Sequence, residues 1–235
     1  MRGKGILKTS GLLLFLALNQ CGLERPLLTW DAPLWEVSSG NTFRFKALAT
    51  HKNDSTRYFL GYEVYYKLKK TDESFSTEEI NIKDANQLEA KGFRRLYSAN
   101  DSQNPLIITY PLYKTDDSYE GSEYTILIDF TNINKCEIYD EGKTRDTYEF
   151  RRSVAYGGQT PASFKHFYKF AKEDADKGSL DLSGLSNGQG FQAQIALYVV
   201  AYGRSIASNT FFAEIKSPAC FLSYLTLTFV YDETE

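Results

Sequence analysis

Two histidines and several carboxylates are the side chains in this 235-residue chain that could carry out hydrolysis. His51 and His166 are candidate general bases, and Asp116 with Asp117 is a candidate acid–base pair. Neither group is part of a nucleophile motif such as Gly-x-Ser-x-Gly. Adjacent carboxylates on an extended chain point in opposite directions, so the two aspartates would not act on one bond. The pattern therefore favours a non-enzymatic protein over a hydrolase.

The acidic segment 115–123 contains Asp116, Asp117, Glu120 and Glu123, whose oxygens could bind calcium. A calcium loop of the EF-hand type needs its ligands at fixed positions between two helices. The spacing here is different, and strands are expected on both sides, so we interpret the segment as a solvated loop. With two histidines and three cysteines in the whole chain, no zinc or copper site and no cofactor is predicted.

Composition indicates a folded, strand-rich protein. Hydrophobic residues make up 42% of the chain and aromatic residues 15%, and large flat side chains favour strands. The net charge of −3 and the pI of about 5.6 argue against a nucleic-acid partner, because such proteins usually carry a basic patch.

Residues 1–20 have the features of an export signal. Arg2, Lys4 and Lys8 form a basic start, and an apolar run follows from Gly11 to Leu18. A helix that crosses a bilayer needs about 20 apolar residues, so this run is too short to span one. We therefore predict a signal peptide that is removed.

The residues Leu18-Asn19-Gln20-Cys21 resemble the cleavage site of bacterial lipoproteins, in which a leucine stands three positions before the lipidated cysteine. Gln20 departs from the small residue that usually precedes the cysteine, as in the looser signals of spirochaete lipoproteins. The resemblance implies lipidation of Cys21 and attachment to the bacterial cell envelope, at the outer membrane. The alternative is an ordinary secreted protein in which Cys21 only lies near the cleavage point.

Cys136 and Cys220 are the other two cysteines. In an oxidising, extracytoplasmic setting an even pair could form a disulfide, worth about 4 kcal/mol in the chain-entropy model. The alternative is two buried free thiols, and the geometry of the strands decides between them.

Residues 61–68 predict the central strand of an antiparallel sandwich. Gly61 would mark the start of this strand. Side chains then alternate between two faces with a period of two. One face carries Tyr62, Val64, Tyr66 and Leu68, and the other carries Glu63, Tyr65 and Lys67.

Similar alternation predicts most of the remaining chain to be strand, in one β-sandwich domain over residues 40–235. The expected strands cover 41–50, 58–68, 93–97, 106–113, 124–130, 148–154, 192–202, 211–215 and 221–231. Both faces of 192–202 are largely apolar, which predicts a central position in the sheet for a strand that ends at Gly203. Residues 21–39 are interpreted as lipid anchor, tether and candidate edge strand, residues 69–77 as a loop, and 84–92 as a short helix. Arg151 and Arg152 are interpreted as a surface pair.

Two segments resemble strands of fibronectin type III domains. Residues 61–66 (Gly-Tyr-Glu-Val-Tyr-Tyr) resemble the third strand, and residues 197–203 (Leu-Tyr-Val-Val-Ala-Tyr-Gly) resemble the sixth. The resemblance implies an all-β, immunoglobulin/fibronectin type III-like antiparallel β-sandwich with a long central insertion and one short helix. Phe45 stands in the region of the usual second-strand tryptophan, and Ile195 stands near the usual corner tyrosine.

The lipoprotein signal, residues 61–66 and residues 92–96 (Gly-Phe-Arg-Arg-Leu) together resemble small leptospiral lipoproteins, a spirochaete family without an established activity. The resemblance implies a membrane-anchored, non-enzymatic binding or adhesion module for a protein or glycan ligand. One alternative is a structural envelope protein that packs with other lipoproteins through exposed Tyr65 and Tyr198, although these tyrosines also fit a cross-strand pair. A secreted hydrolase is the other.

Overall fold

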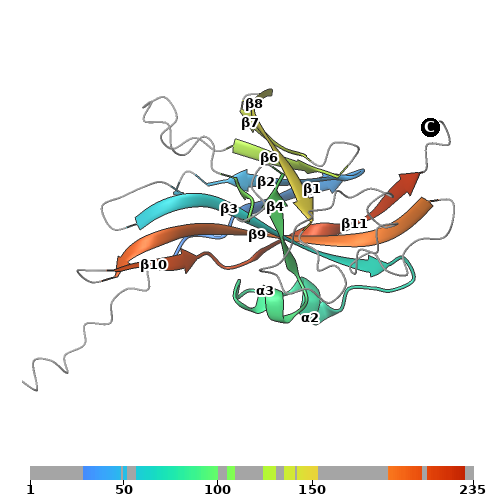
Figure 1. Ribbon diagram of the computed structural model, residues 1–235, viewed down its shortest axis with the longest axis horizontal. Coiled ribbons are helices and arrows are strands. Elements are labelled where there is room, and N and C mark those ends of the chain that lie inside the picture. The colour runs from blue at the N-terminus through green and yellow to red at the C-terminus, as the bar shows by residue number, and fades with distance from the viewer. Residues whose placement is uncertain are drawn as a thin grey trace, which may run out of the picture.

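The computed structural model describes residues 29–48, 50–51, 57–99, 105–108, 124–130, 135–140, 142–152, 190–207 and 211–230. Within these ranges the chain forms an eleven-stranded sheet and two short helices (Figure 1). Every strand pair is antiparallel. The predicted all-β fold class is therefore confirmed.

The elements have the following bounds. The strands are β1 (Leu34–Ser39), β2 (Thr42–Ala47), β3 (Arg57–Lys70), β4 (Arg94–Ser98), β5 (Ile107–Ile108), β6 (Tyr124–Asp129), β7 (Lys135–Asp140), β8 (Lys143–Arg152), β9 (Gly190–Ala207), β10 (Phe211–Lys216) and β11 (Cys220–Val230). The helices are α2 (Thr77–Ile80) and α3 (Gln87–Ala90). The edge strand expected before residue 40 is present as β1.

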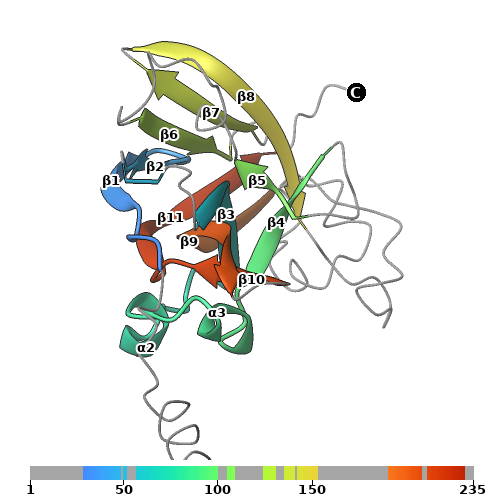
Figure 2. The same ribbon diagram turned by 90° about the vertical axis from the view of Figure 1, so that its left-hand side faces the viewer.

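The strands follow one hydrogen-bonded path, β1-β2-β6-β7-β8-β4-β3-β9-β10, with β11 paired to β9 and β5 paired to β3. Because β4 pairs with both β3 and β8, it joins the two halves of the sheet. Figure 2 shows β1, β2, β6, β7 and β8 curling over β3, β9 and β11, with both helices on the opposite side of β9. The sandwich-like layering follows from this curl, and the fibronectin type III identity stays a prediction.

The ladder between β3 and β9 is the centre of the fold. It runs from Arg57 opposite Ser205 to Lys70 opposite Ala193. The predicted alternation is confirmed, because Tyr62, Val64 and Tyr66 are buried in the main core while Tyr65 belongs to a second cluster on the other face. The predicted central position of β9 is confirmed too, since β10 and β11 pair along its other edge.

Gly61 and Gly203 do not end strands, contrary to the sequence prediction. Gly61 lies at a bulge inside β3 with φ of 140°, and a Cβ there would stand 2.5 Å from the carbonyl oxygen of Ile108. At Gly203, inside β9, a Cβ would stand 2.6 Å from Nε1 of Trp30. Both glycines are thus required by the close approach of another segment: β5 at Gly61, and Tyr58 of β3 together with Trp30 at Gly203.

Residues 217–219 interrupt the pairing along β9, between β10 and β11. Pro218 has no N–H to donate, and the Ser217 side chain accepts a hydrogen bond that a backbone carbonyl would otherwise accept. Its Oγ accepts the N–H of Ala201 at 2.9 Å, while its own N–H donates to the Ala201 carbonyl at 2.9 Å. The break turns the N–H of Ala219 outward, where it donates to the Lys83 carbonyl at 2.8 Å.

Two helices are present where one was predicted. The helix α3 lies inside the predicted range 84–92, whereas α2 was missed because its start was assigned to a polar loop. A capping box begins α2: the Ser76 side chain accepts the N–H of Glu79, and the Glu79 side chain accepts the N–H of Ser76. Residues 71–93, named here the helical segment, cover the outer face of the β3–β9 ladder through a second core.

Candidate functional site

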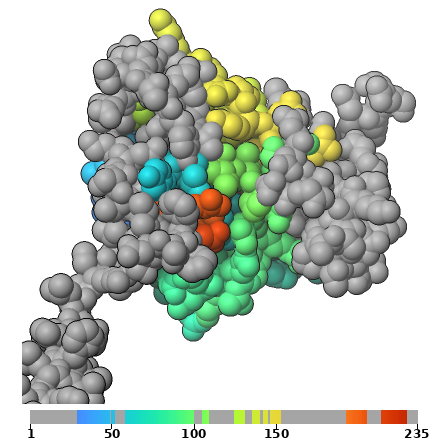
Figure 3. Space-filling view, turned by 60° about the vertical axis from the view of Figure 1, so that its left-hand side comes forward, coloured from blue at the N-terminus to red at the C-terminus, as the bar shows by residue number. Residues whose placement is uncertain are grey.

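A polar cleft of about 520 Å³ opens between the helical segment and the end of β10. In Figure 3 the orange-red surface of the C-terminal strands meets the green surface of the helical segment on one side of the molecule. The lining residues come from three parts of the chain: Thr29, Lys83, Asp84, Ala85, Asn86, Glu214, Lys216, Ser217 and Pro218. Sequence reasoning missed this cleft, because only folding brings its walls together.

One wall of the cleft consists of residues 83–86, which are held against the outer face of β9 by buried contacts and hydrogen bonds. Ile82 and Ala85 are buried against the outer face of β9. The Tyr198 hydroxyl accepts the N–H of Ile82 at 3.0 Å and donates to the Glu79 carbonyl at 2.8 Å. Burial raises the pKa of Tyr198 to about 12, so this hydroxyl keeps its proton at neutral pH. The Lys83, Asp84 and Asn86 side chains are left exposed to the cleft.

The other wall contains Lys216, whose ammonium group is already neutralised. Its Nζ lies 2.7 Å from Oε2 of Glu63 and 2.9 Å from the Tyr65 hydroxyl oxygen. The Tyr65 hydroxyl donates to the same Glu63 oxygen at 2.7 Å. Nη1 of Arg95 lies 3.3 Å from the second Glu63 oxygen. Because the Glu63 side chain is only 3% exposed, this network is a buried support beneath the cleft.

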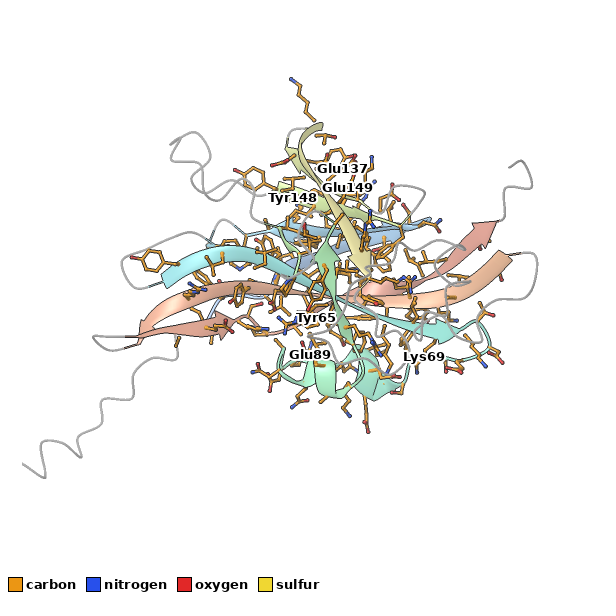
Figure 4. The ribbon with its side chains drawn as sticks, viewed as in Figure 1. Tyr65, Lys69, Glu89, Glu137, Tyr148 and Glu149 are labelled. Carbon is orange, nitrogen blue, oxygen red and sulfur yellow. The ribbon has the colours of Figure 1, made fainter. Side chains whose placement is uncertain are left out.

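Tyr65 stands at the centre of that network. Figure 4 shows it between the sheet and α3, with Glu89 on the helical side and Lys69 toward α2. Lys216 lies over its ring with Nζ 5.6 Å from the ring centroid. Burial, and then the negative charge of Glu63, raise the pKa of Tyr65 well above its usual range. Tyr65 is therefore a fixed hydrogen-bond donor and not a proton-transfer group at neutral pH.

Glu214 gives the cleft an acceptor close to Lys216. Tyr202 donates its hydroxyl to Oε1 of Glu214 at 2.8 Å. Burial, and then this hydrogen bond to Glu214, raise the pKa of Tyr202 to about 12. The cleft thus presents amine, amide, hydroxyl and carboxylate groups together, an arrangement that can hydrogen-bond a polar ligand from several sides.

A second ionic network supports the helical segment at α2. Nζ of Lys67 and Nζ of Lys69 each lie 2.7 Å from one oxygen of Glu79. Burial opposes ionisation of Glu79, but hydrogen bonds from Lys67, Lys69 and Ser76 outweigh it and lower its pKa to about 2. Lys67 also donates to the Lys91 carbonyl at 2.6 Å, which connects α2 to the end of α3.

His51, a candidate general base, is a buried structural residue. Its Nε2 lies 2.7 Å from the Asp31 carbonyl oxygen and its Nδ1 lies 2.7 Å from the Tyr62 hydroxyl. Because a carbonyl only accepts, Nε2 carries the proton and Nδ1 accepts from Tyr62. Burial lowers the pKa of His51 against the opposing effect of Asp31. The ring stacks on Phe59 and meets Trp30 edge-on, so it is enclosed by aromatic side chains.

Several predicted site residues lie outside the described residues. They are the lipidation site Cys21, the second histidine His166, and the acidic residues Asp116, Asp117, Glu120 and Glu123. The signal peptide over residues 1–20 lies outside them as well.

Residues 184–188 read Gly-Leu-Ser-Asn-Gly and match the nucleophile-elbow pattern, a match that the sequence analysis overlooked. They too lie outside the described residues. In hydrolases this pattern follows a strand and begins a helix. Here β9 begins at Gly190, directly after the motif, and its neighbours are antiparallel. Among the described residues, the element that follows the motif is therefore a strand and not the helix of the hydrolase pattern.

Cys136 and Cys220, proposed as a disulfide, are both free thiols in the structure. Cys136 is fully buried on β7, opposite Ile128 and Tyr148. Cys220 begins β11, which packs against β1 and β2, and β6 separates β2 from β7. Burial raises the pKa of both thiols, that of Cys220 to about 11. The second alternative from the sequence, two buried free thiols, is met in part: both thiols are free, with Cys136 buried and Cys220 half-buried.

Two surface interpretations are wrong. Tyr65 and Tyr198 are buried and face each other in the β3–β9 register, so they are the cross-strand pair and not exposed contact residues. Arg152 is fully buried and Arg151 is half-buried, so they are not a surface pair. For the tyrosines, the outer face of the ladder is covered by the helical segment, which the alternation of residue types does not show.

Among the described residues, no group of three or more histidine, cysteine or acidic side chains is placed to hold a metal ion. The described part of the chain also contains no helix long and apolar enough to cross a membrane. Comparisons with protein-family models, with curated proteins and with solved structures give no match for this chain.

Proposed function

We propose that this protein is a lipid-anchored, extracytoplasmic binding protein that holds a glycan in the cleft between residues 83–86 and the end of β10. The observation that carries the proposal is the lining of that cleft. It combines donors, on Lys83, Asn86 and Lys216, with acceptors, on Asp84 and Glu214. Sugars present hydroxyl groups that both donate and accept, so they match a mixed polar wall of this kind.

The charge state of the cleft supports binding without catalysis. Lys216 is paired with Glu63, so the cleft does not concentrate a single sign of charge that would select a strongly anionic or cationic ligand. Tyr65 and Tyr202 have raised pKa values and hold fixed hydrogen bonds. General acid–base catalysis works best when a group titrates near the working pH, and these tyrosines do not. Prearranged hydrogen-bonding groups favour recognition of the ligand.

The proposed anchor is Cys21, and the sequence before it supports the assignment. Thr29, a lining residue of the cleft, follows Cys21 by eight residues. A fully extended chain spans at most about 3.6 Å per residue, so the tether reaches no more than roughly 29 Å. The cleft would therefore operate close to the bacterial outer membrane that holds the lipid.

Binding is tested with the full protein, purified from its native membrane in detergent, on a glycan array followed by calorimetry. Lys83→Ala and Asn86→Ala should each weaken binding about tenfold, since a hydrogen bond to a ligand typically contributes about 1 kcal/mol or more. Lys143→Ala, an exposed change in the β7–β8 hairpin, is the matched control and should bind normally. No glycan binding, or equal binding by all three variants, would contradict the proposal. Capture of a protein ligand that depends on Lys83 would replace the glycan with a protein.

The anchor is tested by the intact mass of the membrane-purified protein. We expect a chain that begins at Cys21 and carries acyl groups, and we expect Cys21→Ser to release the protein from the membrane fraction. An unmodified chain cleaved elsewhere would make this an ordinary secreted protein.

A further inference from the structure

Exposed apolar side chains gather on one strand. Among the described residues, five large hydrophobic side chains are exposed. Three of them belong to the first four residues of β1. Leu34 is 48% exposed, Trp35 is 54% exposed and Val37 is 72% exposed. The other two, Tyr58 and Tyr224, lie on β3 and β11. An apolar cluster on a single edge strand indicates a contact surface, whereas scattered single residues do not.

The strand β1 ends the hydrogen-bonded path of the sheet, with β2 as its neighbour. Charged groups flank its apolar residues: Lys46 lies opposite Leu34 and forms an ion pair with Glu36 at 3.7 Å, and Arg44 lies opposite Glu36. Side chains alternate along a strand, so Trp35 and Val37 lie on the face of Phe45, whereas Leu34 lies on the opposite face beside Lys46. The edge therefore carries apolar side chains on both faces, with the cations on the face of Leu34. This combination suits the boundary between lipid tails and headgroups, where tryptophan and basic residues are enriched.

We infer that β1 lies on the bilayer surface, with Leu34, Trp35 and Val37 in its interfacial layer. The inference depends on the proposed function, because it takes Cys21 as the lipidated residue. Leu34 follows Cys21 by 13 residues, so the tether holds β1 within roughly 47 Å of the anchor when fully extended. Of the five exposed hydrophobic residues, those on β1 are the nearest to Cys21 along the chain.

The contact is shallow. An edge strand carries backbone N–H and C=O groups that have no partner on the open side, and these groups cannot enter the hydrocarbon without a large cost. They stay hydrated among the headgroups, while the side chains of Trp35 and its neighbours reach the upper part of the acyl chains. The charged groups of Lys46 and Glu36, which form an ion pair, also stay at the level of the headgroups, because burying them in hydrocarbon would cost free energy.

A second copy of the chain is a poorer occupant of this edge. Strand addition needs a regular row of backbone groups. Pro33 stands directly before β1, and the register shifts between Glu36 and Ser39. Both features interrupt the edge and disfavour pairing with another strand. A lipid surface requires no register, so the irregular edge does not oppose contact with it.

The two tryptophans of the chain make the test direct. Trp30 is buried and Trp35 is exposed, so Trp35 reports contact with lipid while Trp30 supplies the background. The full protein purified from its native membrane is reconstituted into vesicles whose lipids carry bromine near the headgroup end or near the methyl end of the acyl chains. We expect Trp35 fluorescence to fall at least twofold with the shallow bromines and less with the deep ones.

Two variants control the assignment. Trp35→Phe should abolish most of the quenching. In that background Tyr224→Trp places a tryptophan at a position that is 52% exposed on β11, and bromine at either depth should leave it unquenched. Flotation of the same vesicles measures the anchor separately.

Protein that floats with the vesicles while Trp35 is quenched no more than the tryptophan at position 224 would overturn the inference and leave the anchor intact. Trp35 that is shielded from acrylamide but unaffected by bromine would also overturn it, and would indicate a second copy on β1. Protein that does not float would overturn both the inference and the lipid anchor.

Discussion

The two faces of the β3–β9 ladder are held against the rest of the protein by different forces. The inner face packs apolar and aromatic side chains into the main core, where Ile195, Leu197 and Val199 are fully buried. The outer face carries Glu63, Tyr65, Lys67 and Lys69 on β3, and the helical segment is attached to it through the second core together with ion pairs and hydrogen bonds. The same two strands therefore support the main apolar core on one side and, on the other, a smaller core reinforced by ion pairs.

This difference indicates which part of the protein is adjustable. Apolar burial depends little on salt or pH, whereas ion pairs weaken with salt and with protonation of their acids. The cleft lies on the outer face, between the helical segment and β10. Conditions that loosen the ion pairs should therefore change the cleft before they change the core.

The largest effect is expected on the inner face. Leu197→Ala removes a fully buried side chain and should lower the free energy of unfolding by about 2–5 kcal/mol. Urea denaturation at low and at high salt should give the same loss. A loss that shrinks with salt would show that ionic interactions, and not apolar packing, hold Leu197 in the inner face.

Acid should act mainly on the outer face, through Glu79. Its pKa is about 2 in the folded protein, below the ordinary value of 4.5, so the unfolded chain takes up the proton first as the pH falls. The stabilisation is complete above pH 4.5 and is lost between pH 4.5 and pH 2, by about 3 kcal/mol.

Urea denaturation over that pH range measures the loss. Glu79→Gln should remove this part of the pH dependence. Glu78→Gln is the control, because Glu78 is 80% exposed and should leave the dependence in place. Equal profiles for the two variants would contradict the role given to Glu79.

Substitutions at two neighbouring positions of β3 compare the salt dependence of the two faces directly. Glu63→Gln removes the carboxylate that pairs with Lys216 and one of the two carboxylates that pair with Arg95, which keeps Glu89. The change should cost about 1.5–3 kcal/mol, less at high salt. Val64→Ala, one position along and on the other face, should cost a similar amount at any salt concentration. Thermal unfolding at two ionic strengths makes the comparison, and identical salt responses would remove the distinction between the faces.

The smallest expected effect tests the inner face for its own pH response. His51 contacts the aromatic end of the main core, and burial lowers its pKa from 6.5. The unfolded chain is therefore protonated first, and stability falls as the pH drops below 6.5, with a slope of at most about 1.4 kcal/mol per pH unit. His51→Phe should flatten the unfolding free energy between pH 7 and pH 5. An unchanged slope would assign this pH response to other groups.

Long, alternating strands could be predicted from the sequence. The strands β3, β9 and β11 combine a period of two with many β-branched and aromatic residues, so local pattern and final structure agree. The strand β7 was missed because only Cys136 and Ile138 point inward, and two apolar residues give too short a pattern. The capping box before α2 was a readable signal that a charged, serine-rich context concealed.

The cleft could not have been predicted in the same way. Lys83 and Lys216 are far apart in the sequence, and they meet because the Ser217–Pro218 break directs the chain toward the helical segment. The burial of Tyr65 could not be predicted either, because it depends on the helical segment that covers its face of the sheet. Local patterns report which residues share a face, and they do not report what that face will meet.

The separation of β3 and β9 along the chain determines when the protein can fold. Gly190, the first residue of β9, follows Lys70, the last residue of β3, by 120 positions. Pairing across such a distance is slow, because a long loop must close before any contact rewards it. During synthesis, the central ladder cannot form until most of the chain has left the ribosome. The nascent chain therefore lacks the β3–β9 ladder, and the core packed against it, until residues 190–207 have been synthesised.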